Sequence, residues 1–114
     1  MKLSRRAHSE NVRYGFERER RIARYLSRCG AYVTPSPGSR GPYDIEVRWR
    51  SCLWLVQVKS SRSGVPRWLS RAEKQQLLQC CRAKKAQAIV ALSSKERTLY
   101  YSATSRQRVF LSRL

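Results

Sequence analysis

Acidic residues are scarce in this sequence. Only 7 Asp and Glu stand against 25 Lys and Arg, which gives a formal net charge of +18. Self-repulsion of that size opposes compaction, so a polyanionic partner is the natural explanation. Nucleic acid is the first candidate, because each neutralised phosphate releases condensed counterions. A ribosomal-type structural protein is the plainer alternative. Binding to a membrane surface is disfavoured, because the basic residues are spread along the whole chain rather than gathered on one amphipathic helix.

Thiols and imidazoles are also few, and their spacing does not suit zinc. The 4 cysteines, at positions 29, 52, 80 and 81, include no CxxC pair, and His8 is the single histidine. This spacing excludes the common zinc-binding patterns. We interpret the cysteines as small buried side chains in a reducing compartment.

Long apolar stretches are missing as well. No run of about 18 apolar residues occurs, and the basic residues 1–12 lack the apolar core of a signal peptide. We therefore expect a soluble, cytoplasmic protein with no membrane partner. With 114 residues and 41% hydrophobic side chains, the chain is long enough for one folded domain and too short for two.

The hydrophobic pattern predicts two helices and five strands. Positions Phe16, Ile22, Tyr25, Leu26 and Cys29 approximate helical spacing and predict a helix over 11–29, which Gly30 would end. Ser70 and Glu73 fit a capping box that opens a second helix, ending at 84 or 85, with an inner stripe of Leu69, Ala72, Leu77 and Cys80 or Cys81. The predicted strands are 31–34, 43–49, 52–59, 86–92 and 98–103. The expected fold is α/β, in the order α-β-β-β-α-β-β, preceded by a basic lead-in over residues 1–10.

Strands 43–49 and 52–59 fit an antiparallel hairpin. If paired residues have numbers that sum to 101, Ile45 lies opposite Val56, and the apolar rows of both strands share one face. The polar row on the other face then contains Asp44, Glu46, Gln57 and Lys59.

Carboxylates beside a lysine, in a protein that binds phosphate polymers, favour a site for a divalent metal. Mg²⁺ takes oxygen ligands and prefers one or two carboxylates together with water. Such a metal can polarise a scissile phosphate and activate water, while a lysine positions that water or stabilises the developing charge. The plainer interpretation is an exposed ladder of cross-strand ion pairs with little energetic weight. The residues alone leave both interpretations open.

The arrangement resembles the PD-(D/E)xK nuclease superfamily, and within it the archaeal-type and phage Holliday junction resolvases. The resemblance is carried by "GFERERRIARYLSRCG" with Gly15, Glu19, Arg20 and Gly30, by "PGSRGPYD" with Gly38, Ser39 and Asp44, and by "VQVK" with Gln57 and Lys59. It covers roughly residues 12–60 by motif, with about one extra residue before Asp44. It implies a restriction-endonuclease-like core, a mixed central β-sheet flanked by helices, forming a single nuclease domain over residues 1–114.

The resemblance also implies roles for single residues. Asp44 would be the central metal ligand, Lys59 the catalytic lysine and Glu19 the metal-associated acid of the first helix. Glu17 is the alternative acid, because "ERE" is ambiguous by itself. Gln57 stands where the group has Glu. We favour a role for it as a neutral ligand; the alternatives are that Glu46 supplies the missing charge, or that the site is inactive and the protein only binds DNA.

The implied function is the resolution of four-way DNA junctions by a homodimer, using Mg²⁺, with Mn²⁺ as a substitute. Residues 104–114 would seal the edge of the core or contribute to the dimer contact. The residues expected to approach the DNA backbone are Ser39, Arg40, Arg5, Arg6, Arg13, Arg20, Arg62, Arg67 and Arg71. The alternatives are another endonuclease of the same fold, of a nicking or restriction type, and a non-catalytic architectural DNA-binding protein.

Overall fold

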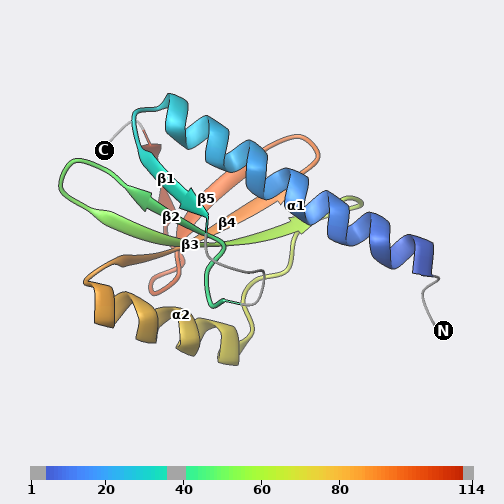
Figure 1. Ribbon diagram of the computed structural model, residues 1–114. Helices are drawn as coiled ribbons and strands as arrows, with labels where there is room; N and C mark the ends of the chain where they lie inside the picture. The colour runs from blue at the N-terminus through green and yellow to red at the C-terminus, as the bar shows by residue number, and fades with distance from the viewer. Residues whose placement is uncertain (1–4, 36–40, 112–114) are drawn as a thin grey trace.

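The computed structural model describes residues 5–35 and 41–111, with side chains from Val12 onward. Its elements are α1 (Arg5–Arg28), β1 (Tyr32–Pro35), β2 (Ile45–Arg48), β3 (Leu53–Ser61), α2 (Arg71–Lys84), β4 (Gln87–Ser94), β5 (Thr98–Ser102) and β6 (Arg108–Val109) (Figure 1). The predicted α/β class and the order of elements are confirmed as far as β5. The short strand β6 arises from the segment 104–114, to which the sequence pattern assigned no element.

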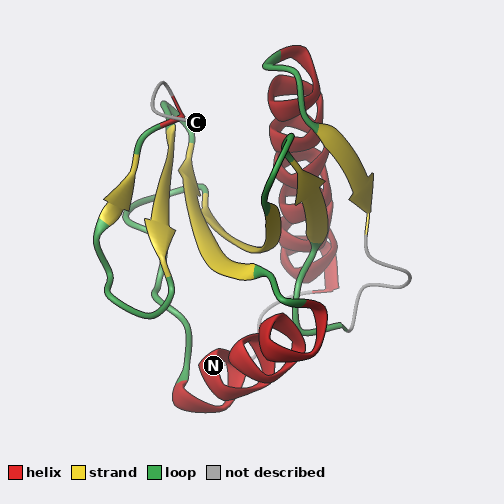
Figure 2. Ribbon diagram, turned by 90° about the vertical axis from the view of Figure 1, so that its left-hand side faces the viewer, coloured by secondary structure: helices red, strands yellow, loops and turns green. Residues whose placement is uncertain are grey.

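The described strands form one six-stranded sheet, in which every strand lies beside its neighbour in the sequence. The pairs are antiparallel except for β3 and β4, which run parallel and are connected through α2. A parallel pair needs such a crossover. In Figure 1, α1 lies on one side of the sheet and α2 on the other, and the view turned by 90° shows the twist of the strands (Figure 2).

The predicted register of the β2–β3 hairpin is confirmed. Ile45 pairs with Val56, and Val47 pairs with Trp54. These four side chains are buried in one cluster with Ile22 and Leu26 of α1. The alternating apolar rows therefore form the floor on which α1 packs, because successive side chains of a strand point to opposite faces.

The opposite face of the sheet is less polar than predicted. Leu55 is fully buried there, together with Leu77 and Cys81 of α2. Tyr43 packs against this second cluster and not with the apolar row of the first face. The reason is that β2 begins only at Ile45, so Tyr43 does not follow the alternation of the strand.

Helix α1 differs from its predicted form in length and in the face that it buries. It is helical from Arg5, so the predicted lead-in is wrong from that residue onward. The predicted stripe is partly wrong, because Phe16 is 43% exposed and Tyr25 is 51% exposed, and Cys29 is exposed as well. Spacing of four residues selects another face, on which Arg18 joins Ile22 and Leu26 in burial.

Helix α2 begins as its capping box predicts. The Ser70 hydroxyl accepts a hydrogen bond from the Glu73 amide at 3.1 Å, and Glu73 Oε1 accepts one from the Ser70 amide at 3.0 Å. Leu77 and Cys81 face the sheet, whereas Ala72 is exposed and was wrongly placed in the inner stripe. Among the cysteines, only Cys81 is buried, which corrects the expectation that all are. None of the described helices is long and apolar enough to cross a membrane.

Candidate active site

Three of the polar residues that the sequence singled out, Glu19, Asp44 and Lys59, lie where β3 ends, between α1 and α2. Asp44 stands just before β2 and is attached to β3 twice. Its amide donates to the carbonyl oxygen of Val56 at 2.8 Å, and its Oδ2 accepts from the amide of Val58 at 2.7 Å. Both the main chain and the carboxylate of Asp44 are therefore held in place by the strand that carries Lys59.

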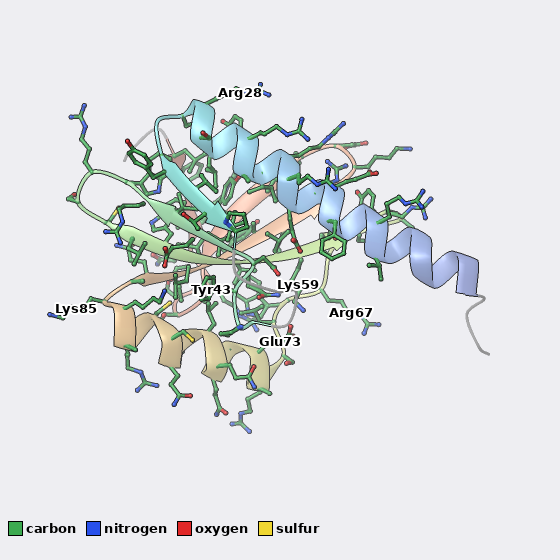
Figure 3. All side chains as sticks on the ribbon, viewed as in Figure 1. Arg28, Tyr43, Lys59, Arg67, Glu73 and Lys85 are labelled. Atoms are coloured by element: carbon green, nitrogen blue, oxygen red, sulfur yellow. The ribbon has the colours of Figure 1, made fainter. Side chains whose placement is uncertain are left out.

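Lys59 is held from the other side, by the first turn of α2. Its Nζ donates to Oε2 of Glu73 at 2.5 Å (Figure 3). The other carboxylate oxygen of Glu73 is the one that accepts from the Ser70 amide. Burial raises the pKa of Glu73, but the hydrogen bonds from Lys59 and Ser70 outweigh it and hold that pKa below its usual value. One glutamate thus caps the helix and fixes the lysine.

Glu19 of α1 lies beside Asp44. Burial, followed by repulsion from the Asp44 carboxylate and a hydrogen bond between the two side chains, raises the pKa of Glu19 to about 7. Burial also raises the pKa of Asp44, although the Val58 amide and Lys59 oppose this effect. Near neutral pH the carboxyl of Glu19 is therefore partly protonated and can donate a hydrogen bond to the carboxylate of Asp44.

Of the two candidate acids on the first helix, Glu19 faces the site. Glu17 is exposed to solvent. The predicted quartet is thus brought together in part: Glu19 and Asp44 lie side by side, Lys59 acts on Asp44 through its charge, and Gln57 lies half-buried on the same strand as Lys59.

Glu46 does not join this group. Its Oε1 accepts from Nζ of Lys84 at 3.0 Å, in the last turn of α2. Glu73, in contrast, lies in the first turn of that helix. Glu46 shares a sheet face with Lys59 but stands farther from the end of β3, where the opposite end of α2 covers it. Among the described contacts, the carboxylate of Glu46 is thus paired with Lys84 and not with Asp44 or Glu19.

Glu73 was recognised in the sequence only as the third residue of a capping box. Its second role depends on the crossover, which brings the start of α2 beside the end of β3. The scarcity of acidic residues could have pointed to Glu73, because each of only 7 acidic residues in a chain of charge +18 is informative.

A second set of contacts ties α1 to the same strand end. The Tyr14 hydroxyl donates to the carbonyl oxygen of Ser61, the last residue of β3, at 3.3 Å. Nε of Arg18 donates to that hydroxyl at 3.0 Å, and the guanidinium lies 5.1 Å from the centre of the Tyr14 ring. A Cβ at Gly15 would lie 3.9 Å from Oγ of Ser60, so the helix runs close to the strand there.

The arginines expected to approach DNA are spread around this region. Those with described side chains are all exposed, namely Arg13, Arg20, Arg62, Arg67 and Arg71. The side chains of Arg5 and Arg6, together with Ser39 and Arg40, lie outside the described residues.

Two neighbouring carboxyl groups, those of Glu19 and Asp44, are available as oxygen ligands for a hard divalent cation. No group of three or more His, Cys, Asp or Glu within the described ranges is arranged to hold a metal by itself. Mg²⁺ takes one or two carboxylates and completes its shell with water and substrate phosphate. Glu19 and Asp44 fit that requirement, because a cation between them would replace the proton on Glu19.

Comparisons with known proteins agree with this architecture. The sequence matches no protein-family model and no curated protein. In three dimensions the chain is similar to Hjc, a Holliday junction resolvase from the archaeal hyperthermophile Archaeoglobus fulgidus, with a TM-score of 0.71 and 23% identity. The match covers 80% of this chain and 74% of that chain. This protein therefore has the α/β fold of that nuclease, a mixed sheet flanked by helices.

Proposed function

We propose that this protein is a metal-dependent endonuclease that resolves four-way DNA junctions. The observation that carries the proposal is the Glu19–Asp44 carboxyl pair beside Lys59, at the end of a buried strand. The similarity in fold to a Holliday junction resolvase supports the choice of branched DNA as the substrate. The charge of +18 supports a polyanionic ligand.

In the proposed reaction, Glu19 and Asp44 would hold Mg²⁺, or Mn²⁺ in its place. A divalent metal, when bound there, supplies charge stabilisation at the phosphate and lowers the pKa of an attacking water. Asp44 is already oriented by its two bonds to β3. Glu19 must give up its proton first, because its pKa of about 7 leaves it partly protonated at neutral pH.

Lys59 orients the water and stabilises negative charge on the phosphate as it develops. The water oxygen forms a bond to phosphorus and loses a proton to solvent, the bond from phosphorus to the 3′ oxygen breaks, and that oxygen takes up a proton from solvent. The products are a 5′-phosphate and a 3′-hydroxyl. Glu73 acts through Lys59 as a positioning residue, because its carboxylate fixes Nζ at 2.5 Å. Gln57 contributes a neutral oxygen next to the carboxyl pair.

The protein acts as a homodimer in this proposal. A four-way junction must be cut in two opposing strands, which requires two active sites, and each monomer supplies one. The exposed arginines near the site hold the sugar–phosphate backbone without reading the base sequence.

The test is cleavage of a synthetic four-way junction in the presence of Mg²⁺, with linear duplexes of the same arm sequences as competitors. We expect paired nicks in the junction and little cleavage of the duplexes, and we expect Lys59→Ala to bind the junction without cutting it. Equal cleavage of both substrates would instead indicate a nicking or restriction-type endonuclease. Binding without any cleavage, across Mg²⁺, Mn²⁺ and a range of pH, would leave an architectural DNA-binding protein.

A further inference from the structure

An arginine occupies a position of α1 that faces the core. Residues four apart lie on one face of a helix, and here that face continues from Leu26 and Ile22 to Arg18. The exposed fraction is 0% for Leu26, 3% for Ile22 and 8% for Arg18. Arginine is rarely buried to this extent unless an opposite charge accompanies it.

No such opposite charge is present among the described residues. The ion pairs found there are Lys59 with Glu73 and Lys84 with Glu46. Glu19, the next residue in the chain, points to Asp44 instead. Arg18 is held by neutral groups, because Nε donates to the Tyr14 hydroxyl and the guanidinium stacks on the Tyr14 ring. Within the described part of the chain, the buried guanidinium of Arg18 thus has no carboxylate partner, which costs stability.

The place of Arg18 explains why such a cost is tolerated. Through Tyr14, the guanidinium is connected to Ser61, two residues beyond Lys59 on β3. The bond at Nε and the stacking on the ring fix the plane of the guanidinium. Among the described residues, no hydrogen bond engages the two terminal nitrogens of that guanidinium, so they can take a phosphate oxygen each.

We propose that Arg18 binds a phosphate of the DNA backbone next to the phosphate that is cut, and that Tyr14 is the residue that positions it. This proposal rests on the proposed function for the identity of the ligand. A phosphate takes two parallel hydrogen bonds from one guanidinium and neutralises the charge that the fold leaves unpaired. The sequence pattern did not select Arg18, because the DNA contacts were sought among exposed arginines.

The experiment compares Arg18→Met with Arg24→Met. Methionine fills a similar volume without charge, and Arg24 is an exposed arginine on the same helix. Binding of a four-way junction is measured without added metal over a series of salt concentrations, together with the melting temperature of the free protein. Both measurements are independent of cleavage.

For Arg18→Met we expect a melting temperature equal to or above that of the wild type, because a buried unpaired charge is removed. We expect the junction affinity to fall about tenfold at moderate salt, and the slope of log affinity against log salt to decrease by about 0.9, as for the loss of one phosphate contact. Arg24→Met should change the junction affinity by no more than about twofold, because in this proposal Arg24 is remote from the bound strand.

A lower melting temperature with an unchanged salt slope would show that Arg18 is structural, and would overturn the proposal. If Arg18→Met fails to fold, junction binding is measured with Arg18→Lys instead. Lysine keeps the charge but lacks the two parallel N–H donors of the guanidinium. We then expect weaker junction binding than in the wild type, and wild-type affinity would overturn the proposal. A wild type that binds but never cuts would remove the nuclease proposal, while the difference in salt slope would still test Arg18.

Discussion

The two ends of α2 carry the same kind of ion pair in different surroundings. At the first turn, Glu73 pairs with Lys59 at 2.5 Å; at the last turn, Lys84 pairs with Glu46 at 3.0 Å. Both pairs join the helix to the same face of the sheet. Among the described residues, only the first pair is shown beside another carboxyl group, because the charges of both Lys59 and Glu73 shift the pKa of Asp44. The second is accompanied by the ring of Tyr43, 5.6 Å from Nζ of Lys84.

The comparison shows that the residues around an ion pair, and not the pair itself, indicate whether it belongs to a functional site. Exposed pairs such as Lys84–Glu46 contribute little to stability and need no further explanation. Lys59–Glu73 is different because it holds a lysine near Asp44, whose side chain contacts that of Glu19. The following predictions change one end of α2 or its surroundings and use the other end as the reference.

The largest effect is expected for Asp44→Asn, with Glu46→Gln as its counterpart. Asn keeps an oxygen for the Val58 amide but removes the charge that would hold metal. We expect junction cleavage to fall by about a thousandfold or more, with the melting temperature little changed. Glu46→Gln should leave cleavage within about twofold of the wild type. Comparable losses in the two variants would remove the distinction between the two ends of α2.

A smaller effect is expected for Glu73→Gln, with Ser70→Ala as the control. Both changes weaken the capping box, so each should lower the free energy of unfolding by about 1 kcal/mol. Only Glu73→Gln releases Lys59, and we expect it to lower single-turnover cleavage by about tenfold, against no change for Ser70→Ala. If cleavage falls equally in both, the contribution of Glu73 is helix stability alone.

Gln57→Glu tests the neutral metal ligand that the proposed function assigns to position 57. An added charge should tighten metal binding, so we expect cleavage to saturate at a lower Mg²⁺ concentration, by about tenfold, with a similar maximal rate. Isothermal titration of Mn²⁺ into the DNA-free protein provides a second measurement. An unchanged metal dependence would mean that position 57 has no part in the site.

Glu19 should make the stability of the folded protein depend on pH near neutrality. Its pKa is raised from 4.5 to about 7, so the folded protein binds more protons than the unfolded chain between these values. Stability from this group is therefore present at low pH and lost as the pH rises through 7. In metal-free protein, we expect the difference in melting temperature between wild type and Glu19→Gln to change over this window. A constant difference from pH 4.5 to 8 would contradict the Glu19–Asp44 contact.

The β2–β3 hairpin and the start of α2 could be predicted because their signals are local. Alternation in two adjacent strands determines a single register that buries both apolar rows, and Ser70 with Glu73 determines a helix start. The contact of Glu19 with Asp44 followed only from the resemblance to known nucleases, since the two residues lie 25 positions apart in the chain.

The remaining features depend on distant parts of the chain. The pairing of Lys59 with Glu73 requires the crossover that returns α2 beside β3, which no local pattern specifies. The burial of Arg18 contradicts its residue type, so a search for apolar spacing selected Phe16 and Tyr25 instead. Strand β6 contains two residues and has no periodicity to detect. Residues that break a local rule are the ones to inspect for function.

The most direct test of the central claim is single-turnover cleavage of a four-way junction by Lys59→Ala and Lys84→Ala, at equal and saturating protein concentration. Both variants lose one lysine and one ion pair of the same helix. We expect Lys59→Ala to cut at least about a hundredfold more slowly than the wild type, and Lys84→Ala to cut at the wild-type rate. Equal rates for the two variants would contradict the assignment of the active site to the end of β3.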